Sequence, residues 1–81
     1  MPTILRKKGY RFAFFAADAD EPVHVHVSKD AKEAKYWLEP FVRLSKNKGF
    51  RPHELTEIER ILRSNREEMI EVWNGYFRTR S

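Results

Sequence analysis

The 81-residue chain has no cysteine, only three glycines and no long hydrophobic run. The absence of cysteine excludes disulfide bonds and thiolate zinc sites, and it suits a reducing compartment. No apolar run approaches the roughly 20 residues of a membrane-spanning helix. The start, Met1-Pro2-Thr3, lacks the apolar core of a secretory signal. We therefore expect a single domain over residues 1–81, located in the cytoplasm and without a membrane partner.

Basic residues exceed acidic ones, and the excess is unevenly placed. Residues 1–51 hold eleven Lys and Arg against six Asp and Glu, whereas residues 52–81 hold five against six. This asymmetry favours an anionic partner for the N-terminal part of the chain. A solvated surface on a small basic protein explains the composition equally well, so the charges alone do not decide the function.

Two sequence stretches at the start of the chain are typical of a β-hairpin. Residues Thr3 to Lys7 and Tyr10 to Ala16 carry strand-like patterns, and Lys8-Gly9 separates them. A two-residue turn of this kind needs positive φ angles, which glycine supplies without strain. We therefore predict a first hairpin that closes at Lys8-Gly9.

Valine and histidine alternate in the stretch Pro22-Val23-His24-Val25-His26-Val27. This period of two predicts a strand with one apolar face and one histidine face. The following stretch, Glu33 to Leu38, pairs with it around the loop Lys29 to Lys32. In this register His24 lies opposite Trp37, and His26 lies opposite Lys35. Cross-strand partners share a face, so these four side chains are expected to form one polar cluster.

The last third of the chain predicts helices. Pro40 ends the preceding strand, residues 41–44 suggest a short further strand or turn, and Lys46 to Gly49 suggest a basic turn. Pro52 suits the first position of a helix. Asn65 and Glu68 have capping-box spacing, which predicts that a second helix starts there. The expected fold class is α+β: a small antiparallel sheet of two hairpins, with four or five strands, followed by two C-terminal helices.

The histidine pair suggests chemistry at a phosphodiester. The Cα atoms of His24 and His26 are expected to be roughly 6.5–7 Å apart on one strand face. One imidazole can accept a proton while the other donates one, because histidine titrates near neutral pH. Lys35 would stabilise phosphate charge, and Trp37 would stack on a base. The predicted catalytic residues are therefore His24, His26 and Lys35.

Two other interpretations of the histidines stay open. An H-x-H pair on a strand can hold a metal ion, for which His24, His26 and Asp20 form the alternative ligand set. The adjacent Lys35 argues against a cation, so no metal or other cofactor is the first expectation. The histidines can equally occupy an ordinary polar face, satisfied by neighbouring hydrogen bonds.

The basic residues of the two hairpins form the candidate nucleic-acid surface. The predicted helical pair is a poor recognition motif, since Glu67, Glu68 and Glu71 would repel a phosphate backbone. The hairpins are better suited to an anionic strand. With Trp37, the predicted nucleic-acid-binding residues are Arg6, Lys7, Lys8, Arg11, Lys29 and Lys32.

The sequence resembles the small bacterial family DUF4160 over nearly its whole length. The resemblance is carried by the opening Met-Pro-Thr-Ile-Leu-Arg, by Tyr10 to Phe12, by His24 to Val27, by Glu33 to Leu38, and by several helical positions including Trp73. The chain departs from the commoner pattern just before the histidines, at Ala19 to Val23. The resemblance implies a domain of unknown function, often encoded beside a second small protein in pairs like toxin–antitoxin modules.

These observations together predict a toxin–antitoxin-like protein that binds nucleic acid. It would act on RNA, through cleavage by the two strand histidines if it is an enzyme. The alternatives are a non-enzymatic interaction module for the neighbouring small protein and a metal-binding domain. Expected partners are RNA and that cognate small protein, and a homodimer stays open.

Overall fold

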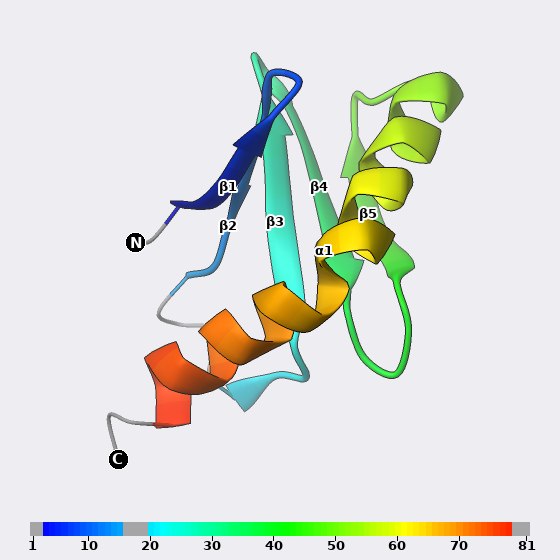
Figure 1. Cartoon of the computed structure of the whole chain (residues 1–81). Coiled ribbons are helices and arrows are strands. Elements are labelled where there is room, and N and C mark those ends of the chain that lie inside the picture. Colours follow the sequence, from blue (N-terminus) through cyan, green and yellow to red (C-terminus); the bar gives the residue numbers. More distant parts are fainter. Residues whose placement is uncertain (1–2, 16–19, 79–81) are drawn as a thin grey trace.

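The computed structural model describes residues 3–15 and 20–78 of the chain. Within these residues five antiparallel strands precede one helix (Figure 1). The strands pair in chain order, and the helix crosses one face of the sheet. The elements are β1 Thr3–Lys7, β2 Tyr10–Ala13, β3 His24–Lys29, β4 Lys32–Trp37, β5 Arg43–Lys48 and α1 Pro52–Arg78. The predicted α+β class and antiparallel sheet are confirmed, and the sheet has five strands.

The first hairpin turns at Lys8-Gly9 as predicted. Both residues have positive φ, 55° and 85°, which matches the twist of a two-residue hairpin turn. Lys7 pairs with Tyr10, and Leu5 pairs with Phe12 beyond them. Strand β2 ends at Ala13, earlier than predicted, and the expected strand end at Ala16 lies outside the described residues.

The second hairpin has the predicted register. His24 pairs with Trp37, and His26 pairs with Lys35. The turn is tighter than expected, because Lys29 also pairs with Lys32 and leaves only Asp30-Ala31 in the loop. Asp30 adopts a φ of 55°, a conformation that aspartate tolerates better than most residues.

The predicted basic turn at residues 46–49 is wrong, because β5 continues to Lys48. Lys46 pairs with Lys35, and Lys48 pairs with Glu33. Pairing with β4 gives the backbone N–H and C=O groups of these residues hydrogen-bond partners that a turn would leave exposed. Lysine also suits an edge strand, because its charge discourages pairing with a further strand from another molecule. The actual turn follows, where the Asn47 side chain accepts from the amide of Phe50 at 3.1 Å and donates to its carbonyl at 3.0 Å.

The prediction of two C-terminal helices is also wrong: α1 runs through Ser64-Asn65 without a break. The Asn65 side chain does not cap a new helix; it donates to the Ile61 carbonyl at 2.8 Å, one turn earlier. A helix accommodates such a residue when its amide bonds back in this way. The apolar stripe keeps its phase across this point, since Leu62 and Met69 lie seven residues apart and are both buried.

The core lies between α1 and one face of the sheet. Strands β2, β3 and β4 contribute alternate residues, and the helix adds its apolar stripe. Fully buried side chains include Phe12, Val25, Tyr36, Ile58 and Leu62. Among the described residues, no helix is both long and apolar enough to cross a membrane.

Two tyrosines tie the sheet to the helix with hydrogen bonds. Tyr10 donates to Glu57 at 2.9 Å, and Tyr36 donates to Glu59 at 2.8 Å. Burial, together with the adjacent Glu57 carboxylate, raises the pKa of Tyr10 to about 12. Burial and Glu59 raise the pKa of Tyr36 further. Both hydroxyls therefore stay protonated donors at any physiological pH, which keeps α1 in register with the sheet.

The start of α1 is capped by its own third residue. Glu54 accepts from the backbone amide of Arg51 at 2.9 Å, the reciprocal half of a capping box. Its other oxygen accepts from Lys32 at 2.6 Å. These two bonds hold the pKa of Glu54 below its usual value. The helix start is thus attached to the turn between β3 and β4.

Candidate functional site

The candidate site lies on the face of the sheet that points away from α1, called the open face below. The register of the strands arranges its side chains in three rows across β2 to β5. The first row is Arg11, Ser28, Glu33 and Lys48; the second is His26, Lys35 and Lys46; the third is His24, Trp37 and Arg43. Alternation places all of these opposite the core residues.

The predicted cluster of four side chains is brought together. The rings of His24 and His26 are 5.1 Å apart, and those of His24 and Trp37 are 5.5 Å apart. The Lys35 ammonium lies 4.6 Å from the centre of the Trp37 ring, in a cation–π contact. The four residues therefore form one connected group on β3 and β4.

His24 is the buried member of this group, with 0% of its surface exposed. Its ring lies between Trp37 on the open face and Trp73 of α1, whose ring centre is 5.3 Å away. The ring atom Nδ1 donates to the Pro22 carbonyl at 2.9 Å, so that nitrogen carries a proton. Glu21 lies 3.6 Å from the same nitrogen. His24 is thus fixed in orientation by its surroundings.

His26 is only partly buried and lines an open hollow of about 440 Å³. The hollow lies between β3, β4 and β5, and its charged lining is Lys35, Lys46, Lys48 and Glu33. The ring of Phe15 packs 4.2 Å from the His26 ring. Three ammonium groups around one imidazole make this hollow suited to an anionic group.

Lys35 connects the cationic hollow to Trp37. Its ammonium donates to Glu21 at 2.8 Å while it contacts the indole ring, and 20% of its side chain is exposed. Glu21 therefore supplies a carboxylate where an external anion would otherwise meet Lys35. A bound phosphate would compete with this carboxylate for the same ammonium.

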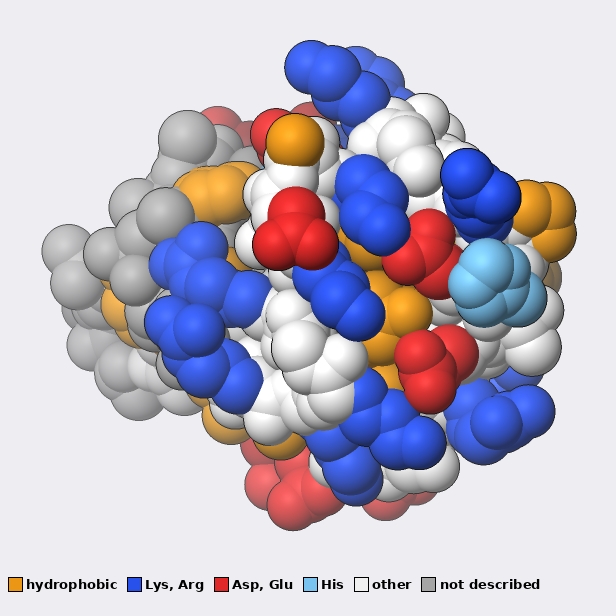
Figure 2. All heavy atoms as spheres, turned by 90° about the horizontal axis from the view of Figure 1, so that it is seen from above, with side chains coloured by type: hydrophobic (Ala, Val, Ile, Leu, Met, Phe, Trp, Pro, Cys, Tyr) orange, Lys and Arg blue, Asp and Glu red, His pale blue; other side chains and the backbone are white. Residues whose placement is uncertain are grey.

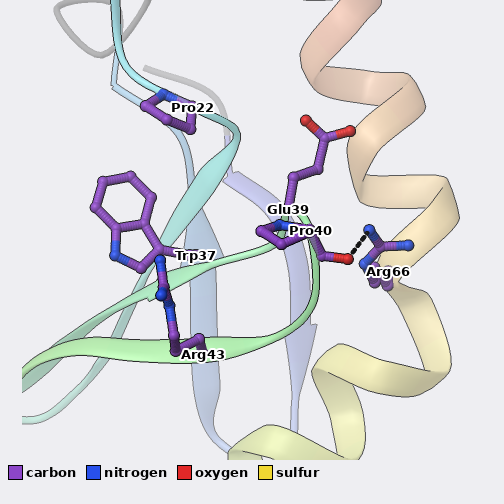
Figure 3. Close-up of a pocket in the computed structure, with 6 residues that line it drawn as sticks. All are labelled: Pro22, Trp37, Glu39, Pro40, Arg43 and Arg66. Atoms are coloured by element: carbon purple, nitrogen blue, oxygen red, sulfur yellow. Dashed lines mark hydrogen bonds between the residues drawn. The ribbon is translucent and has the colours of Figure 1, made fainter.

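A second open hollow of about 600 Å³ lies beside Trp37 (Figure 3). Its walls are the indole ring, the rings of Pro22 and Pro40, and the side chains of Arg43, Glu39 and Arg66. Arg66 reaches over from α1 and donates to the carbonyls of Leu38 at 2.6 Å and Pro40 at 3.0 Å. The loop between β4 and β5 is thereby attached to the middle of the helix.

The predicted nucleic-acid-binding residues divide between two surfaces. Arg6 and Arg11 pair across β1 and β2 in the row of Ser28, so they extend the open face. Lys8, Lys29 and Lys32 instead lie at the end of the molecule where the hairpin turns meet the helix start. Lys7 also borders this end, in a hollow shared with Glu57.

The lysines at this end are balanced by helix carboxylates. Lys32 binds Glu54 at 2.6 Å, Lys8 lies 3.6 Å from Glu57, and Lys29 lies over the Tyr10 ring at 4.8 Å. The Tyr10 hydroxyl and Lys8 help to hold the pKa of Glu57 below its usual value. Figure 2 shows this end, with basic and acidic side chains interspersed around an apolar centre. This end of the molecule therefore carries less net positive charge than its number of lysines suggests.

Two site residues that sequence reasoning missed are Lys46 and Lys48. They were assigned to a turn, and only their pairing with β4 places them on the open face. A signal was present, because the alternation of Lys46 and Lys48 has strand period. Arg43, the partner of Trp37, was also missed, because no pairing was predicted for residues 41–44.

The alternative metal site does not assemble in the described part of the chain. Over residues 3–15 and 20–78, no group of three His, Cys, Asp or Glu side chains is arranged to hold a metal ion. Asp20 is exposed and does not join His24 and His26 in such a group. Within the described ranges, His24, His26 and Asp20 thus do not form a group of three ligands.

Comparison with known proteins places the chain in a family and goes no further. Neither the curated proteins nor the solved structures contain a match. Residues 9–74 match a family described as a domain of unknown function, DUF4160. This match spans β2 to β5 and most of α1, including every residue of the two hollows. The chain therefore belongs to the DUF4160 family.

Proposed function

We propose that the protein binds single-stranded RNA on its open face. The observation that carries the proposal is the clustering of cations and an aromatic ring on β4 and β5. Lys35, Lys46 and Lys48 surround the His26 hollow, and Trp37 with Arg43 lines the next one. Cationic grooves beside stacking platforms are the usual means of holding single strands.

The charge balance of the open face supports this proposal. Among the described residues, its cations are Arg6, Arg11, Lys35, Arg43, Lys46 and Lys48. The carboxylates near them are Glu33, opposite Lys48, Glu21, bound to Lys35, and Glu39, which lines the same hollow as Arg43. In the part of the chain that the structure describes, this surface is a sheet with no protruding helix to enter a duplex groove. This shape favours an unpaired strand, whose bases are free to stack.

The geometry supports binding more strongly than cleavage. A general acid and a general base must both reach the phosphodiester within hydrogen-bond distance. His26 borders the cationic hollow, but His24 has no exposed surface and contacts two tryptophans. His24 is therefore better suited to orient Trp37 than to exchange protons with a substrate. A role within a toxin–antitoxin-like pair stays a prediction.

Neutralising the cationic hollow should weaken RNA binding in a salt-dependent way. For Lys46→Gln with Lys48→Gln, we expect about a tenfold loss of affinity for a labelled single-stranded 12-mer at low salt. Each lost phosphate contact should also lower the slope of log affinity against log salt by about 0.7. Fluorescence anisotropy with RNA and DNA oligomers of one sequence measures both quantities.

The matched control removes the same charge from the opposite side of the molecule. Arg60 and Arg63 are exposed on α1, so Arg60→Gln with Arg63→Gln changes the net charge equally. We expect this pair to retain most of the affinity and the salt slope. Equal losses of affinity in both double variants would mean that the overall charge of the protein, and not the open face, attracts the RNA. Absence of binding by the unmodified protein would refute the proposal.

A further inference from the structure

We infer that the hollow beside Trp37 accepts one unstacked base of the bound strand. This inference rests on the proposed function and specifies how the strand is held. It assigns different tasks to the two hollows. The cationic hollow around His26 takes phosphate, and the hollow beside Trp37 takes the base of a neighbouring nucleotide.

The lining of the Trp37 hollow matches the chemistry of a nucleobase. The indole ring and the rings of Pro22 and Pro40 provide flat apolar surface. Arg43 comes from the strand position opposite Trp37, and its planar guanidinium is suited to stacking as well as to phosphate. The volume of about 600 Å³ lies within the usual range of small-molecule sites.

The hollow is held in shape by contacts from three elements. Arg66 of α1 donates to the carbonyls of Leu38 and Pro40, which fixes the loop that carries Pro40. On the other side, His24 lies edge-on to the Trp37 ring at an interplanar angle of 77°. The His24 ring is itself held by its bond to Pro22. Preorganised walls of this kind reduce the entropy lost when a base enters.

The spacing between the two hollows fits one nucleotide chain. Trp37 and Lys35 are two residues apart on β4, which separates their Cα atoms by roughly 6.5–7 Å. Their partners on β5, Arg43 and Lys46, continue the same two rows. An RNA strand that crosses from the row of Lys35 to the row of Trp37 contacts the lysines first and the aromatic ring second. One extended nucleotide can therefore engage both hollows.

An aromatic side chain of a partner protein is the competing occupant, and the charges favour the nucleotide. Arg43 and Arg66 outnumber Glu39 in the hollow, and the adjoining hollow carries three lysines. A nucleotide places a phosphate near these cations along with its base, whereas an aromatic side chain of a protein carries no phosphate. The test must therefore separate the contribution of the base from that of the phosphates.

The test compares an oligoadenylate 12-mer with an abasic 12-mer of equal charge. We use Trp37→Leu, which keeps apolar contact with His24 but removes the aromatic face. If the hollow holds a base, this variant should bind oligoadenylate about tenfold more weakly and the abasic strand unchanged, because stacking contributes on this scale. Equal losses on both strands, or no loss on either, would overturn the inference while leaving the proposed function intact.

Tryptophan fluorescence provides a second readout that leaves the residues lining the hollow unchanged. The chain has two tryptophans, so Trp73→Phe leaves Trp37 as the only one. Oligoadenylate should quench its emission, and inorganic polyphosphate should bind without quenching. Quenching by both ligands, or by neither when both bind, would contradict a base pocket. Failure of the unmodified protein to bind any strand would instead refute the proposed function.

Discussion

Replacing Asn65 by proline should destabilise the protein by about 3 kcal/mol or more. Asn65 lies in the middle of the single helix α1, and its side chain bonds to the Ile61 carbonyl. A proline ring at this position removes the backbone hydrogen bond and clashes with that carbonyl. Whole domains are stable by only about 5–15 kcal/mol, so the loss is a large fraction of the total. Urea unfolding followed by circular dichroism measures it.

The variant Asn65→Ala is the control for this experiment. It also loses the side-chain bond to Ile61, but alanine is the better helix former, so the two effects nearly offset each other. We expect a change within about 1 kcal/mol. If a second helix began at residue 65, proline would be tolerated there, because the first turn of a helix has amides without intrahelical partners. Equal stability of the two variants would contradict a continuous helix.

Replacing Trp73 by alanine should cost about 3–5 kcal/mol, the usual range for a buried tryptophan. Its ring packs 5.0 Å from Phe14, 5.3 Å from His24 and 4.3 Å from Phe77. The substitution therefore removes the contact that joins the end of α1 to the sheet and to His24. Thermal and urea unfolding should both show the loss.

The neighbouring residue Val72 supplies the matched control. It lies on the same turn of α1, but 45% of its surface is exposed. We expect Val72→Ala to change the stability by no more than about 0.5 kcal/mol. A small loss for Trp73→Ala, comparable with that of Val72→Ala, would mean that the end of the helix does not pack on the sheet as described.

The hairpins were predictable because their signals are local. Lys8-Gly9 carries the turn chemistry, and the alternation of valine with histidine assigns each side chain of β3 to a face. A shift of one residue in the pairing of β3 with β4 would have placed apolar and polar side chains on the same face. The pairing of His24 with Trp37 and of His26 with Lys35 therefore followed from pattern alone, without knowledge of the helix.

The errors arose where tertiary packing outweighs local preference. Asn65 and Glu68 have the spacing of a cap, yet packing of the continuous stripe against the sheet keeps the helix intact. The turn prediction at Lys46 to Gly49 failed because pairing with β4 extends β5. In both cases, a partner distant in sequence determines the local structure.

The clustering of His24, His26, Lys35 and Trp37 was predicted, but the burial of His24 was not. Alternation places His24 on the open face, and it could not reveal that Trp73 would reach its ring from α1 and bury it. Charge counting could not separate the lysines of the open face from Lys8, Lys29 and Lys32. Lys8 and Lys32 pack against helix carboxylates, contacts that depend on the long-range position of α1, and Lys29 lies over the Tyr10 ring of the neighbouring strand.

Titration of ¹⁵N-labelled protein with a single-stranded RNA 12-mer tests the central claim most directly. Amide shifts report which surface contacts the strand. We predict that the largest shifts fall on β4 and β5, at residues 33–37 and at Arg43–Lys48, with smaller ones at His26. The exposed side of α1 around Arg60 and Arg63 should stay unchanged. Shifts concentrated on that side of α1, or at the end formed by Lys8, Lys29 and Lys32, would contradict RNA binding on the open face.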